Sequence, residues 1–125
     1  MTAPKVVDAS AVAALLFDEL AANAVAVELE GAALVAPSLI IFELANVCLV
    51  KCRRHPHEAE ALITALRLFE RLGVQIVPVD QEAVVRLAQD TGLSAYDASY
   101  LWLARRFEAN LVTLDKRLAA ARVER

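Results

Sequence analysis

The chain has 125 residues, 58% of them apolar, and its 13 basic and 16 acidic residues give a net charge of −3. We expect one domain, residues 1–125, which is long enough to bury roughly two-thirds of the surface that its unfolded form exposes. The negative charge excludes the overall basic character that drives non-specific binding to nucleic acids. Binding to RNA or DNA would therefore require a cation or a local basic patch.

The apolar residues do not form a membrane-spanning segment. The longest uncharged stretch, residues 31–42, has 12 residues and is interrupted by Pro37, which makes it too short to cross a bilayer. Residues 1–20 lack a basic start followed by a long apolar core, so we expect no secretory signal, no membrane association and a cytoplasmic location. The surplus of apolar residues is expected to cover an interface with a second subunit or another partner.

The first apolar run, residues 5–7, ends on Asp8. We interpret this run as a strand followed by a helix that begins at Ser10, which places the Asp8 carboxylate at the carboxyl edge of a sheet. Open α/β folds bind their ligands at this edge. Asp8 is therefore the first candidate site residue.

Helical and strand-forming segments alternate along the rest of the chain. Glycines end three of the helical segments, and Ser38, Asp80 and Ser94 are candidate N-caps. Residues 11–17 and 20–30 are predicted to form two short helices or one bent helix. The other predicted helices cover residues 38–54, 57–72, 80–91, 94–107 and 116–122, and the later strands cover residues 33–36, 74–79 and 111–114. This alternation predicts an α/β fold with a parallel sheet.

Glu43 has surroundings that are unusual for a carboxylate. Its neighbours at helical spacing are mostly apolar, so it lies in the stripe that should face the sheet: Leu39, Ile40, Asn46, Val47 and Val50. An unpaired carboxylate is costly to bury there. The alternative is a core-facing glutamate that an arginine or a backbone amide satisfies.

Asp97 lies in a helical segment that is apolar on nearly every side. It follows Ser94 by three residues, and this spacing resembles a capping box with aspartate in place of the usual glutamate. A purely structural role as a cap is therefore an equally good interpretation of Asp97 alone.

Asp8 and Asp115 each follow a predicted strand. Asp115 is also a candidate N-cap of the last helix, and Asp8 is also compatible with a simple turn. If the strand order is doubly wound, the first and last strands are neighbours and these two acids flank the crevice at the sheet edge. The starts of the helices that carry Glu43 and Asp97 would overhang the same edge.

Four carboxylates in one place require protons or a cation. At separations of about 4 to 6 Å, each close pair repels by several kcal/mol at an effective dielectric constant near 20. Oxygen ligands without a nearby histidine or cysteine favour Mg²⁺ or Mn²⁺ over zinc. A divalent ion would also neutralise a phosphodiester and so compensate for the negative charge of the chain.

Four stretches of the sequence together resemble the PIN-domain nucleases, and more closely the VapC ribonuclease toxins of prokaryotic toxin/antitoxin pairs. They are Val7-Asp8-Ala9-Ser10; Ala36-Pro37-Ser38 through Glu43, with Asn46 and Val47; Tyr96-Asp97-Ala98 with Tyr100-Leu101; and Leu111-Val112-Thr113-Leu114-Asp115-Lys116-Arg117-Leu118. They are spread over nearly the whole chain and keep the order and spacing of the family. The set is more specific than any single motif in it.

The resemblance implies a three-layer α/β domain with a parallel five-stranded sheet and helices on both faces, although the chain leaves little room for a fifth strand. It implies endonucleolytic cleavage of RNA that depends on Mg²⁺ or Mn²⁺. Asp8 and Asp97 would be the principal metal ligands, Glu43 and Asp115 would complete the acidic site, and Ser10 and Thr113 would orient carboxylates or water. The resemblance further implies a homodimer and a cognate antitoxin that covers the active-site groove.

Three other groups of residues are weaker candidates. Cys48, Cys52, His55 and His57 fall within ten positions, but Pro56 interrupts them, and a free cysteine pair with two loop histidines is the preferred interpretation over a structural zinc site. The aromatic residues Tyr96, Tyr100, Trp102 and Phe107 are expected to pack in the core rather than stack on bases. Among the short basic pairs, Lys116 and Arg117 are the best candidates for contact with phosphate, and ordinary solvated charge on a helix is the default interpretation.

Two further function classes remain as alternatives. A receiver-like regulatory module needs an acidic pair after its first strand, but Ala9 follows Asp8. A phosphatase of the haloacid-dehalogenase type has a second aspartate two residues after the first, where this chain has Ser10. A metal-dependent endoribonuclease is the leading hypothesis.

Overall fold

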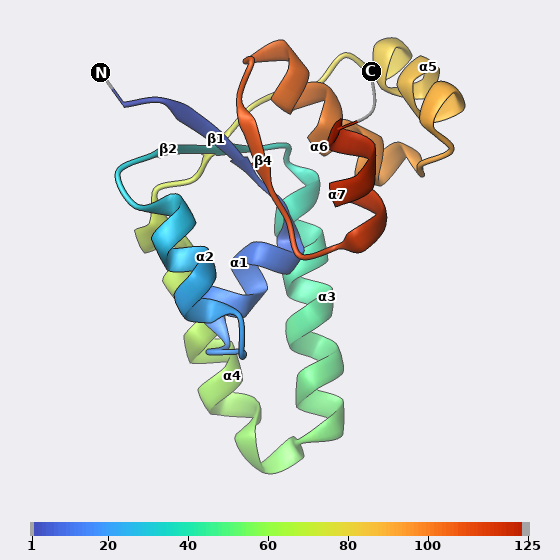
Figure 1. Cartoon of the computed structure of the whole chain (residues 1–125). Coiled ribbons are helices and arrows are strands. Elements are labelled where there is room, and N and C mark those ends of the chain that lie inside the picture. The colour runs from blue at the N-terminus through green and yellow to red at the C-terminus, as the bar shows by residue number, and fades with distance from the viewer. Residues whose placement is uncertain (1, 124–125) are drawn as a thin grey trace.

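The computed structural model describes residues 2–123, and a parallel sheet of four strands lies at its centre (Figure 1). The strands are β1 (Pro4–Val7), β2 (Ala33–Ala36), β3 (Gln75–Ile76) and β4 (Asn110–Val112). Their order in the sheet is β3-β2-β1-β4. The first and last strands of the chain are therefore neighbours, and the described residues form no fifth strand.

Helices cover both faces of the sheet and give the three layers of the predicted α/β fold. α6 (Ala95–Arg106) packs on β1 and β4, and α5 (Gln81–Thr91) packs on α6. α1 (Ala9–Leu16) and α2 (Ala22–Leu29) pack on each other, and α2 also contacts β4. α7 (Lys116–Val123) packs on α6. None of the described helices combines the length and the apolar character that a membrane crossing requires.

The carboxyl-terminal halves of β1 and β4 are apolar because both faces of the sheet are covered there. Successive strand residues point to opposite faces of a sheet, yet Val6 and Val7 of β1 are both completely buried. Leu111 and Val112 of β4 are buried in the same way. Coverage on both faces is typical of parallel sheets, and it explains why these strands are short apolar runs rather than alternating ones.

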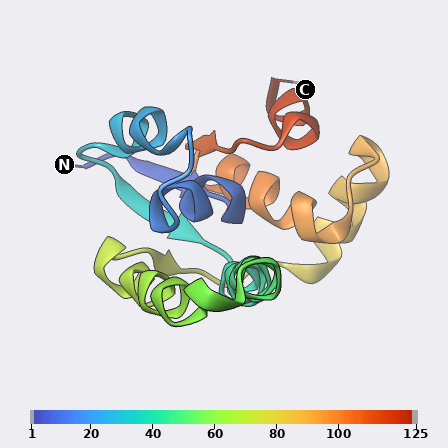
Figure 2. The same ribbon diagram turned by 90° about the horizontal axis from the view of Figure 1, so that it is seen from below.

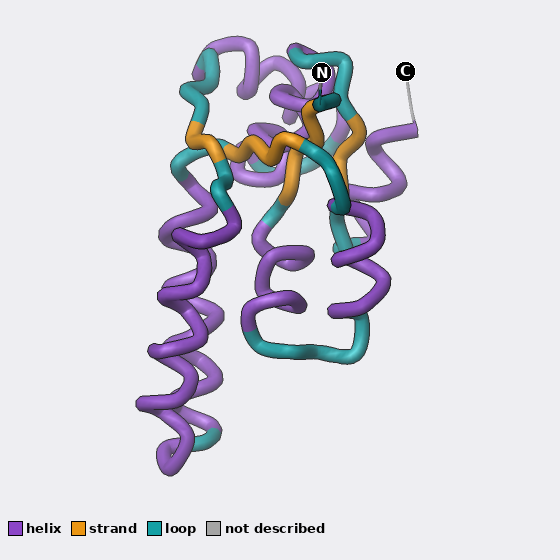
Figure 3. The backbone as a smooth tube through the Cα atoms, turned by 90° about the vertical axis from the view of Figure 1, so that its left-hand side faces the viewer, coloured by secondary structure: helices purple, strands orange, loops and turns teal. Residues whose placement is uncertain are grey.

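α3 (Leu39–Arg54) and α4 (Ala59–Arg67) form a long hairpin that extends away from the sheet (Figures 1 and 3). Figure 2 looks along α3 and shows α4 beside it. The 3₁₀ turns η1 (Pro56–Glu58) and η2 (Leu68–Leu72) flank α4. Only the first turns of α3 lie at the sheet edge, next to the end of β2, and this is where Glu43 lies.

Two predicted helix starts differ from the structure. α1 begins at Ala9 rather than at Ser10, because Asp8 itself is the N-cap and accepts a hydrogen bond from the Ala11 amide at 3.0 Å. Ser38 precedes α3, but its own backbone is already helical and its side chain makes no capping bond. The prediction that Ser38 is the N-cap of α3 was therefore wrong, although α3 does begin directly after Ser38.

Two predicted segments are longer than the elements that the structure shows. The helix expected over residues 57–72 is divided into η1, α4 and η2. The strand expected over residues 74–79 is reduced to Gln75–Ile76, because Pro78 has no amide hydrogen to donate to a neighbouring strand. β3 accordingly lies at the edge of the sheet.

Candidate functional site

Asp8 lies at the end of β1 and is buried, with 5% of its surface exposed. One carboxylate oxygen, Oδ1, accepts hydrogen bonds from Ser10 Oγ at 2.7 Å and from the Ala11 amide at 3.0 Å. The other oxygen, Oδ2, accepts one from Thr113 Oγ1. Burial raises the pKa of the Asp8 carboxyl above its ordinary value, although these hydrogen bonds lower it in part and nearby Asp115 raises it.

Ser10 and Thr113 connect the ends of β1 and β4. The two strands pair in parallel with Val7 opposite Val112, so the residues that follow them lie side by side. Ser10 Oγ also accepts a hydrogen bond from the Leu114 amide at 2.9 Å, and Thr113 Oγ1 accepts one from the Asp115 amide at 3.0 Å. The two hydroxyls thus fix the Asp8 carboxylate relative to the backbone that leads to Asp115.

Glu43 lies in the second turn of α3 and is half-buried. Its Oε1 accepts a hydrogen bond from the Tyr100 hydroxyl of α6, a partner 57 positions away in the sequence. Desolvation raises the pKa of Glu43, the hydrogen bond from Tyr100 lowers it, and the charges of Asp8 and Asp97 raise it. The sequence-based alternative of an arginine or amide partner was wrong, because the partner is a tyrosine.

Asp97 lies in the first turn of α6 and is half-buried. Its backbone amide donates to Ser94 Oγ at 3.1 Å, so the predicted cap at Ser94 is confirmed. Burial raises the pKa of the Asp97 carboxyl, the charges of Asp115 and Asp8 raise it further, and the charge of Arg117 lowers it. The cap uses the backbone of Asp97, which leaves its carboxylate free for another role.

Asp115 follows β4 and caps α7. Its Oδ1 accepts hydrogen bonds from the amides of Arg117 at 2.9 Å and Leu118 at 3.1 Å. The predicted N-cap role of Asp115 is therefore confirmed. The same carboxylate is close enough to act electrostatically on Asp8 and Asp97.

The four carboxylates that the sequence analysis singled out thus lie in one electrostatic neighbourhood. Asp8 interacts with the other three acids, and Asp97 interacts with Asp8, Glu43 and Asp115. They come from β1, α3, α6 and the end of β4, which all reach the carboxyl edge of the sheet. Beside them lies a groove of ≈ 690 Å³, which includes Ser10 and Glu43 in its lining.

This set of residues fits a hard divalent cation. All four side chains offer carboxylate oxygens, the ligands that Mg²⁺ and Mn²⁺ prefer. Within residues 2–123, no group of three or more His, Cys, Asp or Glu side chains is close enough together to form a complete set of metal ligands. The fit rests instead on the chemistry of the donors, because a nearby cation would stabilise the charged forms of the partly or fully buried carboxylates of Asp8, Glu43 and Asp97.

Sequence reasoning missed Tyr100 as a member of the site. Tyr100 was expected to be a core residue, and its ring is indeed buried, with 1% of its surface exposed. A buried tyrosine hydroxyl requires a polar partner, and this requirement was the available signal. Burial and the hydrogen bond to Glu43 raise the pKa of Tyr100, so its hydroxyl remains protonated and acts as a donor.

Cys48 and Cys52 are both free thiols on α3, and Cys48 is buried. Burial raises the pKa of the Cys48 thiol, and the neighbouring Cys52 raises it further. His55 forms an exposed contact with Glu58 at 3.6 Å. In the part of the chain that the structure describes, these residues and His57 do not gather into a metal cluster.

Comparisons with known proteins agree with this architecture. A family model described as PIN domain matches residues 5–124. Seven chains of solved structures match the fold, among them the crystal structure of PAE2754 from Pyrobaculum aerophilum. That structure is 27% identical with a TM-score of 0.79, and the match covers 97% of this chain and 86% of that chain. A search of curated protein sequences finds no significant match.

Proposed function

Because the chain belongs to the PIN-domain family, whose fold is that of metal-dependent nucleases, we propose that it is an endoribonuclease that hydrolyses RNA phosphodiester bonds with Mg²⁺ or Mn²⁺. The observation that carries this proposal is the convergence of Asp8, Glu43, Asp97 and Asp115 at one edge of the sheet. Carboxylates with raised pKa values beside a groove are typical of functional sites.

Asp8 and Asp97 would be the principal ligands of the divalent ion, and Glu43 and Asp115 would complete the acidic site. A divalent ion in such a site neutralises charge on a phosphodiester and makes water a stronger acid. Ser10 and Thr113 hold the Asp8 carboxylate in place through their hydroxyls. Tyr100 does the same for Glu43.

Basic side chains beside the acids supply a place for the substrate phosphate. Lys116 and Arg117 are exposed at the start of α7, directly after Asp115. The Arg117 guanidinium lies close enough to Asp97 to lower its pKa. We assign these two residues to phosphate contact, which attracts RNA locally in a chain whose net charge is −3.

We further propose that the protein is the toxin of a toxin/antitoxin pair and acts in the cytoplasm. The support is the set of four motifs that resembles the VapC ribonuclease toxins. The cognate antitoxin would be a small protein that covers the groove beside Glu43. The test is expression in a bacterium with and without the neighbouring small reading frame, where toxicity that this frame suppresses is the expected result.

The direct test of the nuclease is cleavage of a labelled single-stranded RNA with Mg²⁺, with Mn²⁺ and with EDTA. Asp8→Asn should reduce the rate by about 100-fold or more, because loss of a metal ligand costs at least as much as loss of a residue that supports one. Asp18→Asn is the matched control, since Asp18 is an exposed acid in the turn between α1 and α2. Equal cleavage under all of these conditions would refute the proposal.

A further inference from the structure

Two aromatic side chains, Phe42 and Tyr96, are exposed beside the acidic groove. Phe42 is 71% exposed and Tyr96 is 66% exposed. The prediction that Tyr96 packs in the core was therefore wrong. Each ring belongs to the residue directly before an acid of the site, because Phe42 precedes Glu43 on α3 and Tyr96 precedes Asp97 on α6. Large exposed side chains that gather in this way are typical of binding surfaces.

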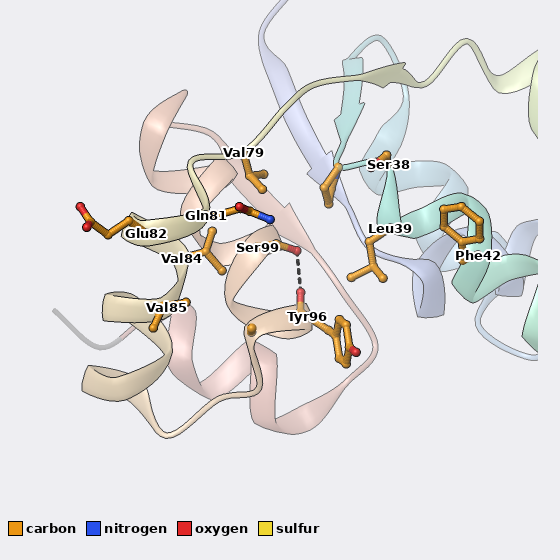
Figure 4. Close-up of a pocket in the computed structure, with 12 residues that line it drawn as sticks. Ser38, Leu39, Phe42, Val79, Gln81, Glu82, Val84, Val85, Tyr96 and Ser99 are labelled. Atoms are coloured by element: carbon orange, nitrogen blue, oxygen red, sulfur yellow. Dashed lines mark hydrogen bonds between the residues drawn. The ribbon is translucent and has the colours of Figure 1, made fainter.

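The two rings lie where two hollows of the surface meet. Both line the acidic groove, and both line a neighbouring hollow of ≈ 690 Å³. Figure 4 shows Val84 and Val85 of α5 on one side of this hollow, Leu39 and Phe42 of α3 on the other, and the ring of Tyr96 between them. A substrate that is held by the acids can therefore extend into the hollow along the two rings.

The polar groups of the hollow are nearly all uncharged. They include Ser38, which makes no capping bond, and Gln81, which points toward Ser99 in Figure 4. Among the described residues, Glu82 is the only charged one in the lining. Its side chain points away from the hollow in Figure 4, and its carboxylate lies 3.9 Å from the Arg86 guanidinium. The hollow therefore suits a neutral group with polar edges better than it suits a phosphate.

An unpaired nucleobase has these properties. Bases are flat and uncharged, and proteins recognise them in single-stranded RNA by stacking on aromatic rings and by hydrogen bonds to their edges. The charged RNA backbone has its own place, because the phosphate is assigned to the acidic site with its divalent ion and to Lys116 and Arg117. The charges of the two hollows thus match the two parts of a nucleotide.

We propose that a base next to the cleaved phosphodiester enters the hollow and stacks on the rings of Tyr96 and Phe42, with the Gln81 amide at its polar edge. This inference deepens the proposed function and rests on it for the position of the base beside the cleaved bond. Its consequence is a preference for single-stranded RNA, because a base in a duplex is already paired and stacked.

The experiment measures the binding of RNA separately from its cleavage. The affinity for a labelled single-stranded RNA is determined by fluorescence anisotropy with Ca²⁺ in place of Mg²⁺, and a gel shows that the RNA stays intact. Tyr96→Ala and Phe42→Ala should each weaken binding by about 5-fold to 150-fold, which corresponds to the loss of one stack between a base and an aromatic ring. Tyr96→Phe keeps the ring and should bind as the wild type does.

Phe107→Ala is the matched control for the loss of a ring. Phe107 is 40% exposed and lines neither the hollow nor the acidic groove, so its loss should leave RNA binding unchanged. A duplex of the same sequence should bind equally to the wild type and to Tyr96→Ala. Circular dichroism shows whether the variants are folded, which the exposure of Phe42 and Tyr96 favours.

An abasic nucleotide, moved along the strand one position at a time, identifies the base that stacks. At one position it should weaken binding to the wild type as much as Tyr96→Ala does. The two changes together should cost less than the sum of their separate effects, because both remove the same contact. Losses that add at every position would overturn the proposal.

Unchanged binding by both Tyr96→Ala and Phe42→Ala would also overturn the proposal, as would an equal loss in Phe107→Ala. So would a Tyr96→Ala variant whose mass in solution changes while its affinity for RNA does not, because the face would then bind protein. RNA that is bound through the rings but is not cleaved with Mg²⁺ would refute the nuclease and keep the base-binding hollow. Cleavage with a wild-type KM by Tyr96→Ala would keep the nuclease and refute the hollow.

Discussion

Thr113 Oγ1 donates a hydrogen bond to Asp8 Oδ2 and so joins the end of β4 to the end of β1 across 105 positions of the sequence. The pairing of the two strands brings these residues together. The bond lowers the pKa of a carboxyl that burial otherwise raises. Thr113 is therefore a positioning residue that also helps to keep Asp8 ionised.

Thr113→Val should move the acidic limb of the activity profile to higher pH. The substitution keeps the shape of the side chain but removes a donor to the ionised carboxylate, so the pKa of Asp8 rises and its charged form is lost at a higher pH. Stability should fall by about 1 kcal/mol for the lost hydrogen bond. The measurement is the cleavage rate as a function of pH.

Thr64→Val is the matched control for this prediction. Thr64 is exposed on α4 and its hydroxyl donates to the Glu60 carbonyl at 3.0 Å, so its loss should leave the pH profile unchanged. A Thr113→Val profile that falls uniformly at every pH would show that Thr113 does not act through the ionisation of Asp8.

Much of the site was predictable because aspartates that follow parallel strands must meet at one edge. Asp8 and Asp115 follow β1 and β4, and the sequence identifies both strands as apolar runs. The N-cap role of Asp115 was also predictable, because aspartate before a helix accepts backbone amides, whereas the structural role expected for Asp8 was only a turn. The structure shows that the structural and the electrostatic roles of these two residues coexist.

Contacts between helices were not predictable from the sequence. The bond between Tyr100 and Glu43 depends on how α6 and α3 approach each other over the sheet edge, and no local pattern encodes this approach. The exposure of Tyr96 was missed for a similar reason. It depends on whether another element covers that side of α6, and the described residues provide none.

Tyr100→Phe should disturb the site through Glu43. Removal of the hydroxyl takes away the hydrogen bond that lowers the pKa of Glu43, so this pKa should rise and the acidic limb of activity should shift upward. A double-mutant cycle with Glu43→Gln measures the coupling, which should be about 0.5–3 kcal/mol for residues in direct contact. Additive effects of the two substitutions on stability would contradict a direct coupling.

Without divalent ions, the protein should lose stability as the pH rises. Asp8, Glu43 and Asp97 have folded-state pKa values above their ordinary values of 3.8, 4.5 and 3.8. The folded state therefore binds protons more tightly than the unfolded state. The free energy of unfolding should fall from these ordinary values up to the raised folded-state values.

Urea unfolding at several pH values in EDTA measures this trend, and Asp8→Asn should reduce its slope. Adding Mg²⁺ at neutral pH should restore stability by about 2.7 kcal/mol at 100 times its dissociation constant. Asp18→Asn should keep the wild-type slope. Stability that is independent of pH in EDTA would mean that burial and the neighbouring acids do not raise the folded-state pKa values of these carboxyls.

Arg117→Met separates two roles of one side chain. The Arg117 guanidinium donates to the Gly92 carbonyl at 2.9 Å and lowers the pKa of Asp97. If Arg117 acts through Asp97, its loss raises the pKa of that carboxyl, and the activity should fall mainly at low pH. If it contacts the phosphate, KM should rise at every pH. The slope of the logarithm of the RNA-binding constant against the logarithm of the salt concentration should also become shallower by about one.

Lys116→Met is the matched control for this variant, because it removes the same charge from the neighbouring exposed position. We expect Arg117→Met to show both effects and Lys116→Met to show only the effects on KM and on salt dependence. The reason is that Arg117, unlike Lys116, is among the charges that act on Asp97. Identical pH profiles of the two variants would mean that Arg117 acts only on the phosphate and that burial and the other acids set the ionisation of Asp97.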